Sequence, residues 1–282
     1  MDIIIGTTAG FCFGVKNAVN KTIEELNNKE HVYCLGELVH NKQVTNELIE
    51  KGLIFVDNIE DAKNNAIIRA HGVPVSVYEK ADVLGIELKD LTCPKVLAIH
   101  KLAIKYSKDK YYIFLVGQKT HPETIGTASF CGENLSIIEN IDDIVNEIDN
   151  FKNSKLEKAV VLAQTTISLE KFNKIVEKLK MLIENIEVKN TICASTKQRQ
   201  EETEDIAKKV EAMIIVGGKH SSNSNKLYEI AKKYCNNVFF IETKEELNLE
   251  KIKSFKSLGI MAGASTPQKS VTEVVDIIKK TC

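Results

Sequence analysis

Short apolar runs alternate with amphipathic stretches along the chain, and one pattern of this alternation occurs three times. Each time, an apolar run leads to a cysteine, and a segment with helical periodicity follows. In each repeat, three further apolar runs follow. The first precedes a polar loop that opens a helix, the second precedes an acidic stretch, and the third ends in a polar tip. Strands alternating with helices predict parallel sheets with right-handed crossovers. The pattern therefore predicts an α/β fold of three similar units.

Three landmarks mark each repeat. The first is the cysteine after an apolar run: Cys12, Cys93 and Cys193. The second is a polar residue 28 positions after that cysteine: His40, His121 and Ser221. The third is the polar tip of the last strand, 59, 72 and 72 positions after the cysteine: His71, Thr165 and Ser265. Ligands of open α/β sheets bind at the carboxyl ends of the strands. If the units pack around a pseudo-threefold axis, one central pocket collects all nine residues.

The acidic stretches predict a helix between the second and third strands of each unit. They are Glu60-Asp61, Asp142-Asp143 and Glu245-Glu246. Negative charge is favourable in the first turn of a helix, because the N-terminal end of the helix dipole is positive. We therefore expect one helix after each of these stretches.

Composition narrows the class of protein. The 282 residues include 38 Lys and Arg against 39 Asp and Glu, for a net charge of −1, which argues against a nucleic-acid or membrane-surface binder. The apolar runs are far shorter than the ~20 residues of a membrane-spanning helix. The first residues do not have the basic start of a signal peptide. We expect a cytoplasmic protein, in which cysteines stay reduced.

The repeated cysteines suggest a thiolate-bound metal. A helix N-terminus favours the thiolate, and three thiolates that meet need a cation to hold them. Zinc would need a fourth ligand and usually uses close Cys pairs, whereas these cysteines lie 81 and 100 residues apart. A 4Fe–4S cluster held by three cysteines would leave one iron open to a substrate oxygen. Burial as small hydrophobic residues is the alternative, and we expect it or indifferent exposure for the four that do not recur: Cys34, Cys131, Cys235 and Cys282.

The polar landmarks suggest an anion site beside the metal. Imidazoles, hydroxyls and an amide at helix N-termini suit a diphosphate, although Ser and Asn also serve as plain helix caps. Glu123 is a candidate general acid with a raised pKa; the alternative is a surface glutamate. Thr165 and Thr166 would orient a proton or cap a helix. We expect the other three histidines to be structural or solvated: His31, His100 and His220.

These residues lie in stretches that together resemble one family. The stretches run in order over nearly the whole chain: Gly10-Phe11-Cys12-Phe13-Gly14-Val15, Leu38-Val39-His40-Asn41, Arg69-Ala70-His71-Gly72-Val73-Pro74, Thr92-Cys93-Pro94, His121-Pro122-Glu123, Gln164-Thr165-Thr166, Ser221-Ser222-Asn223-Ser224 and Gly263-Ala264-Ser265. The chain resembles the LytB family of 4-hydroxy-3-methylbut-2-enyl diphosphate reductases. The resemblance implies a pseudo-threefold trefoil of α/β units at residues 14–93, 94–193 and 194–282, with an N-terminal strand within residues 1–13 joining the third.

The resemblance also implies the chemistry. It implies a 4Fe–4S cluster on Cys12, Cys93 and Cys193, and reductive removal of an allylic hydroxyl to give isopentenyl and dimethylallyl diphosphates. The residues implied to hold the diphosphate are His40, His71, Ser221, Ser222, Asn223 and Ser265. The residues implied at the hydroxyl end are His121, Thr165 and Thr166, with Glu123 starting proton delivery. A ferredoxin- or flavodoxin-type donor and a monomeric enzyme are expected.

Two other classes of protein remain open from the residues alone. A non-catalytic binder of a phosphorylated metabolite would use the cysteines as a redox sensor and would release no water under reductant. A zinc hydrolase would use Glu123 as its base, would be colourless and would need no electron donor.

Overall fold

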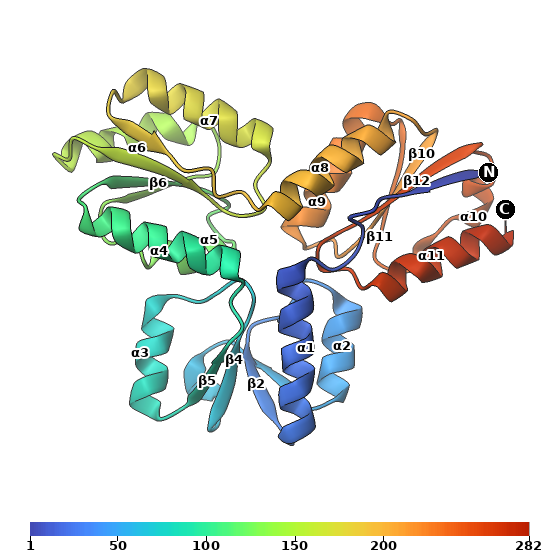
Figure 1. Cartoon of the computed structure of the whole chain (residues 1–282), viewed down its shortest axis with the longest axis horizontal. Helices are drawn as coiled ribbons and strands as arrows, with labels where there is room; N and C mark the ends of the chain where they lie inside the picture. Colours follow the sequence, from blue (N-terminus) through green and yellow to red (C-terminus); the bar gives the residue numbers. More distant parts are fainter. Residues whose placement is uncertain (282) are drawn as a thin grey trace. The chain divides into compact units, whose positions relative to one another are not determined.

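The computed structural model describes residues 1–281 and contains three four-stranded sheets (Figure 1). Their strand orders are β3-β2-β4-β5, β7-β6-β8-β9 and β11-β10-β12-β1, and all the strands are parallel. The arrangement is the same in each sheet. One central strand (β2, β6 or β10) lies between the next two strands along the chain, and the outer strand (β5, β9 or β1) pairs with the second of those two (β4, β8 or β12). The predicted fold class of three similar α/β units with parallel sheets is therefore confirmed. Their grouping about a common axis stays a prediction.

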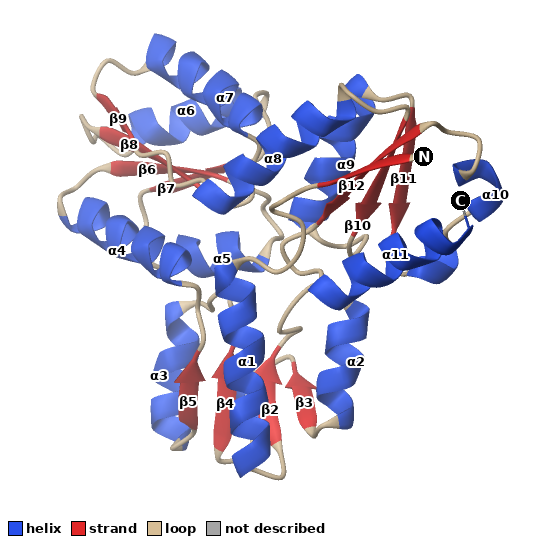
Figure 2. Ribbon diagram, turned by 45° about the vertical axis from the view of Figure 1, so that its right-hand side comes forward, coloured by secondary structure: helices blue, strands red, loops and turns tan. Residues whose placement is uncertain are grey.

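The first sheet has the shortest connections. Its strands are β2 (Val32–Leu35), β3 (Leu53–Val56), β4 (Asn65–Ile68) and β5 (Glu87–Asp90), drawn side by side in Figure 2. The helices in this part of the chain are α1 (Phe13–Asn28), α2 (Lys42–Glu50) and α3 (Val75–Leu84). The helix expected at Glu60-Asp61 is wrong, because only a 3-10 turn (Ile59–Asp61) forms there. Eight residues separate β3 from β4, too few for a helix and its two connections.

The second sheet is covered by helices on both faces. Its strands are β6 (Tyr112–Val116), β7 (Leu135–Ile138), β8 (Ala159–Ala163) and β9 (Ile186–Val188). The helices are α4 (Pro94–Lys108), α5 (Pro122–Ala128), α6 (Asp143–Asn153) and α7 (Leu169–Leu182), with α6 and α7 on one face and α4 and α5 on the other (Figure 1). Every residue of β6 and β8 is buried. These central strands are therefore continuously apolar, as expected for parallel strands covered on both sides.

The third sheet takes its outer strand from the chain start. Its strands are β10 (Ala212–Val216), β11 (Asn237–Ile241), β12 (Ser257–Ala262) and β1 (Asp2–Ile5), and Ile3 of β1 pairs with Leu258 of β12. The helices are α8 (Ala194–Ala207), α9 (Ser222–Tyr234), α10 (Leu249–Ile252) and α11 (Gln268–Thr281), with a 3-10 turn at Lys244–Glu246. Helices α8 and α9 cover one face, and α10 and α11 cover the other (Figure 1).

The chain groups into two compact bodies. The first body contains Met1–Lys16, Val39–Glu50 and the chain from Ala194 onward, and the second contains Asn17–Leu38 and Lys51–Cys193. The limits expected for three domains stay a prediction. Cys282 lies outside the described residues. Among the described helices, none has the length and apolar character needed to cross a membrane.

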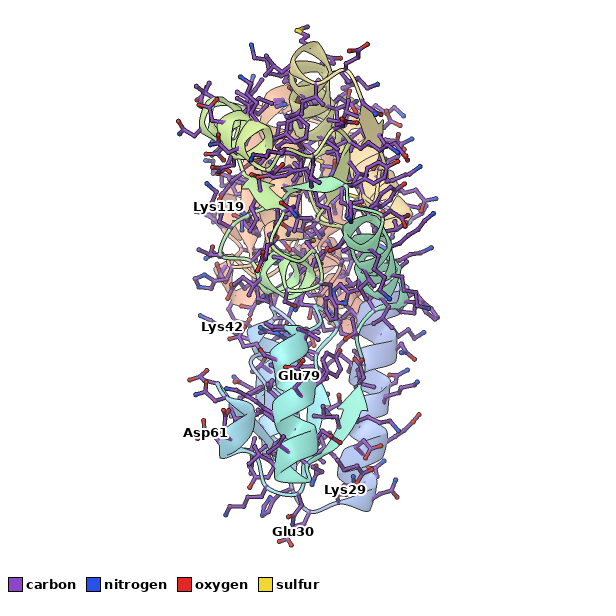
Figure 3. The ribbon with its side chains drawn as sticks, turned by 90° about the vertical axis from the view of Figure 1, so that its left-hand side faces the viewer. Lys29, Glu30, Lys42, Asp61, Glu79 and Lys119 are labelled. Carbon is purple, nitrogen blue, oxygen red and sulfur yellow. The ribbon has the colours of Figure 1, made fainter. Side chains whose placement is uncertain are left out.

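Charged residues surround the unit of the first sheet. Glu30, Asp61 and Glu79 are exposed and project outward (Figure 3). Such charges keep the outer surface solvated, while the polar residues at the carboxyl ends of the strands are largely buried. Because polar groups are buried at this edge of each sheet, we expect the functional site there.

Candidate functional site

The repeated cysteines occupy equivalent places in the three units. Each lies directly before a helix, and each donates a backbone hydrogen bond to a carbonyl two residues past the end of the neighbouring strand. The three bonds are Cys12 to Ala264 at 3.0 Å, Cys93 to Ala70 at 3.0 Å and Cys193 to Thr165 at 3.1 Å. Because a backbone contact repeats, the equivalence does not depend on side-chain placement. This backbone hydrogen bond places each cysteine at the carboxyl edge of its own sheet.

The remaining described cysteines differ from these three. Cys34, Cys131 and Cys235 are buried, whereas the three repeated cysteines are half-exposed, and none of these six described cysteines forms a disulfide. Burial raises the pKa of both Cys34 and Cys131 to about 12, so these two thiols stay protonated. This confirms burial for the described cysteines outside the repeat.

Glu123 is a buried carboxyl at the first turn of α5. Only 2% of its surface is exposed. Its two oxygens accept hydrogen bonds from the backbone N–H and the hydroxyl of Thr165, each at 2.6 Å. Burial raises the pKa of Glu123 to about 7, although both bonds from Thr165 act to lower it. The carboxyl can therefore hold or release a proton near neutral pH, and the interpretation as a surface glutamate is wrong.

His121 fixes the entry to the same helix. It is the N-cap of α5, and its Nδ1 accepts a hydrogen bond from the backbone N–H of Glu123 at 3.2 Å. A neutral imidazole that accepts at Nδ1 carries its proton on Nε2. The ring meets that of His71 edge-on, with centroids 5.4 Å apart and planes at 86°. The structure thus brings together His71, His121, Glu123 and Thr165.

Gln164 links the loop after β8 to two other elements, a role that the sequence reasoning missed. Its side-chain oxygen accepts hydrogen bonds from the Gln118 backbone N–H at 2.9 Å and the Thr124 hydroxyl at 3.2 Å. Its amide nitrogen donates to the hydroxyl of Thr166 at 2.8 Å. Through these three bonds, the buried Gln164 holds the half-buried Thr166 beside Thr165. The signal in the sequence was a polar residue directly after an apolar strand.

The first body gathers a second group of polar residues. The hydroxyl of Ser265, after β12, donates to the backbone carbonyl of His40 at 3.2 Å. Gly218, after β10, passes so close to the same carbonyl that an added Cβ would lie 2.4 Å from its oxygen. Loops far apart in the sequence therefore meet at His40.

The start of α9 completes this group. Ser221 is the N-cap, and its hydroxyl accepts the backbone N–H of Ser224 at 3.3 Å. Ser222 begins the helix and is half-buried. Asn223 is buried, and neither its amide oxygen nor its amide nitrogen has a hydrogen-bond partner among the described residues. A buried amide lacking partners is costly, and a bound polar ligand would satisfy it.

The other three histidines lie outside these groups. His100 is buried in α4, stacks on Phe130 with ring centroids 4.4 Å apart, and has a pKa lowered by burial to about 4. His31 and His220 are exposed. The expectation that these histidines are structural or solvated is confirmed.

The two groups lie in different bodies. Cys12 and His40 belong to the first body, and Cys93, Cys193 and His121 belong to the second. Meeting of all three thiols in one pocket stays a prediction.

Comparison with known proteins identifies relatives that match nearly the whole chain. The LytB protein family matches residues 3–279. A protein of Clostridioides difficile named 4-hydroxy-3-methylbut-2-enyl diphosphate reductase is 42% identical over 283 residues, covering 99% of each chain. A protein of the same name from Aquifex aeolicus is 38% identical, covering 100% of this chain and 97% of its own.

Two solved structures share the fold. One, of (E)-4-hydroxy-3-methyl-but-2-enyl diphosphate reductase, the terminal enzyme of the non-mevalonate pathway, is 38% identical with a TM-score of 0.73, covering 99% of this chain and 100% of its own. The other, of the E-1-hydroxy-2-methyl-but-2-enyl-4-diphosphate reductase of Plasmodium falciparum, is 29% identical with a TM-score of 0.89, covering 98% and 87%. This chain therefore belongs to the LytB protein family.

Proposed function

We propose that the chain is an iron–sulfur reductase that converts (E)-4-hydroxy-3-methylbut-2-enyl diphosphate to isopentenyl and dimethylallyl diphosphates. Family membership makes it an oxidoreductase of isoprenoid biosynthesis, acting at the last step of the non-mevalonate pathway. The observation that carries the residue assignments is the backbone contact repeated at Cys12, Cys93 and Cys193. It makes the three thiols equivalent, as a shared ligand set requires.

The three repeated cysteines fit an iron–sulfur cluster by their chemistry. They form no disulfide and are half-exposed at helix starts, whereas the other described cysteines are buried. Cysteine sulfurs are the donors that such clusters take. We assign a 4Fe–4S cluster to Cys12, Cys93 and Cys193, with its fourth iron open to substrate. When bound, the cluster supplies single electrons and a Lewis-acidic site.

The diphosphate is assigned to the polar group around α9. The buried amide of Asn223 offers both a donor and an acceptor, and the Ser221 and Ser265 hydroxyls lie at the same edge of the sheet. The helix N-terminus adds backbone N–H groups and the positive end of its dipole. His40, His71 and Ser222 complete the proposed set. Binding energy from the diphosphate would position the reacting carbon.

The proton is assigned to Glu123. Its pKa of about 7 lets the carboxyl carry a proton at neutral pH, and its bond to the Thr165 hydroxyl offers a path outward. His121, with its proton on Nε2, faces the hydroxyl end of the substrate together with Thr165 and Thr166. These residues hold and move protons within a site where Glu123 and Thr165 are buried.

The overall reaction uses two electrons and two protons. The allylic C–O bond breaks, the hydroxyl leaves as water, and one new C–H bond forms at either end of the three-carbon allyl unit. This accounts for two products from one substrate. We also propose a ferredoxin- or flavodoxin-type electron donor, a monomeric enzyme and a cytoplasmic location.

An anaerobic turnover assay tests the function. Protein purified without oxygen is mixed with the substrate and a reduced viologen dye, and both products are quantified. We expect both isomers, with two equivalents of dye oxidised per molecule of substrate. Binding of the diphosphate without consumption of reductant would favour the sensor class. Metal-dependent hydrolysis without a reductant would favour the zinc hydrolase.

A further inference from the structure

The loop that leads to Cys12 is longer than its two counterparts. Residues 6–11 separate β1 from Cys12, whereas residues 91–92 separate β5 from Cys93 and residues 189–192 separate β9 from Cys193. A longer connection has more conformational freedom to lose when its cysteine is fixed in one place. The Cys12 loop therefore needs more restraint than the other two.

The other two loops are fixed by a side chain three residues before the cysteine. Asp90 accepts the backbone N–H of Thr92 at 2.9 Å, and Asn190 accepts the backbone N–H of Ile192 at 3.1 Å. These are Asx turns, which fix the chain directly before each cysteine. The equivalent residue before Cys12 is Ala9, whose side chain cannot accept a hydrogen bond.

Two residues of α8 supply the missing restraint. Glu202 accepts the backbone N–H and hydroxyl of Thr7 at 2.6 and 2.7 Å, and those of Thr8 at 2.9 and 2.5 Å. Arg199 donates to the backbone carbonyl of Gly10 at 2.6 Å. The two side chains are three residues apart and so share one face of the helix.

The charge of Glu202 suits this contact. Burial acts to raise the pKa of Glu202, but the four hydrogen bonds from Thr8 and Thr7 together outweigh it and hold the pKa below its usual value. The carboxylate is therefore ionised at neutral pH, when it accepts all four bonds most strongly.

The loop itself has little room for another path. Gly10 has a φ of 115°, and a Cβ added at Gly6 would lie 2.0 Å from the sulfur of Met261. The two glycines allow the tight course that the Glu202 and Arg199 contacts hold.

We propose that Glu202 and Arg199 are positioning residues that hold the Cys12 loop so that its thiol is presented as a cluster ligand. This inference rests on the proposed function for the role of Cys12. Neither residue belongs to the three repeated landmarks. Their role follows from the contacts between α8 and the loop, which are 189 to 195 residues apart in sequence. Residues that orient metal ligands in this way typically affect metal affinity strongly.

The test compares Glu202→Gln with Glu201→Gln in the full chain reconstituted anaerobically with iron and sulfide. Glu201 is the exposed neighbour on the same helix and serves as the matched control. Iron loss to a chelator is followed by absorbance, and alkylation of Cys12, Cys93 and buried Cys235 is followed by peptide mass spectrometry. Thr8→Val removes one donor to Glu202. This variant is measured in the same way if Glu202→Gln does not fold.

We expect Glu202→Gln to lose iron about tenfold faster than Glu201→Gln. Alkylation should rise at Cys12 and stay unchanged at Cys235. Equal iron loss in the two variants, or a rise shared by Cys12 and Cys235 as in general unfolding, would overturn the inference. If the wild-type chain takes up no cluster, the proposed function fails, and selective alkylation of Cys12 still decides whether Glu202 restrains the loop.

Discussion

Thr165 and Glu123 are joined by two hydrogen bonds, from the backbone N–H and the hydroxyl of Thr165 to the two carboxyl oxygens, each at 2.6 Å. The carbonyl of the same threonine accepts the backbone N–H of Cys193 at 3.1 Å. One residue thus connects the proposed proton donor to the loop of a proposed cluster ligand. The consequences of this connection can be measured.

Replacement of Glu123 by Gln should remove turnover and spare binding. The amide has nearly the same shape but cannot deliver a proton, so we expect kcat to fall by about 10² to 10⁴ while the substrate Kd changes little. The measurement is anaerobic kinetics together with calorimetric binding. Glu133→Gln, at an exposed glutamate, is the matched control. Turnover of Glu123→Gln at the wild-type level would remove Glu123 from the mechanism.

The hydroxyl of Thr165 should set the pH at which activity declines. Its bond to Glu123 stabilises the ionised carboxyl, so its removal in Thr165→Val should raise the pKa of Glu123 above its value of about 7. A general acid works in its protonated form, so activity falls as pH rises through this pKa. The basic limb of the pH–rate profile should therefore move to higher pH in Thr165→Val and return in Thr165→Ser. Identical limbs in all three proteins would contradict the assignment.

Glu123 should also make stability depend on pH. Its pKa is about 7 in the folded chain, against an ordinary value of 4.5, so the folded chain binds more protons between these values. The resulting contribution of Glu123 to the free energy of unfolding is fully present below pH 4.5 and is lost as pH rises through 7. Its size is up to about 3 kcal/mol. The difference in unfolding free energy between wild type and Glu123→Gln should therefore favour wild type more at pH 5 than at pH 8. A difference independent of pH would show that Glu123 has an ordinary pKa.

Asn223 should act on substrate affinity. Asn223→Ala removes a buried amide whose two polar atoms have no partner among the described residues. Loss of a hydrogen bond to a charged phosphate costs about 1.5 to 3 kcal/mol, so the substrate Kd should rise roughly 10- to 150-fold. Asn236→Ala, at an exposed asparagine, is the control. An unchanged Kd in Asn223→Ala would place the diphosphate elsewhere.

The threefold repeat could be predicted because the three units share one sequence pattern of strands, cysteine and helix starts. Apolar runs, cysteines and polar loops at matching distances predicted strands, helix starts and the edge where they meet. The missing helix after β3 was also visible in the sequence, because the first unit has an offset of 59 residues where the others have 72. The shorter connection leaves room for the 3-10 turn at Ile59–Asp61 alone.

The parts that could not be predicted depend on contacts between distant segments. Burial of Glu123 follows from packing around α5, and no local pattern separates it from a surface glutamate. The contact of Glu202 with Thr7 joins residues 195 positions apart. In the sequence Glu202 is one of several acidic residues on a polar helix, so only the fold reveals its role.

The iron and sulfide content of anaerobically purified protein tests the central claim most directly. We expect a brown wild-type protein with about four irons and four sulfides per chain. Each single Cys→Ser change at Cys12, Cys93 or Cys193 should lose most of both elements, whereas Cys131→Ala, at a buried cysteine, should keep them. A colourless zinc-containing wild type, or an intact cluster spectrum in any of the three serine variants, would contradict the account.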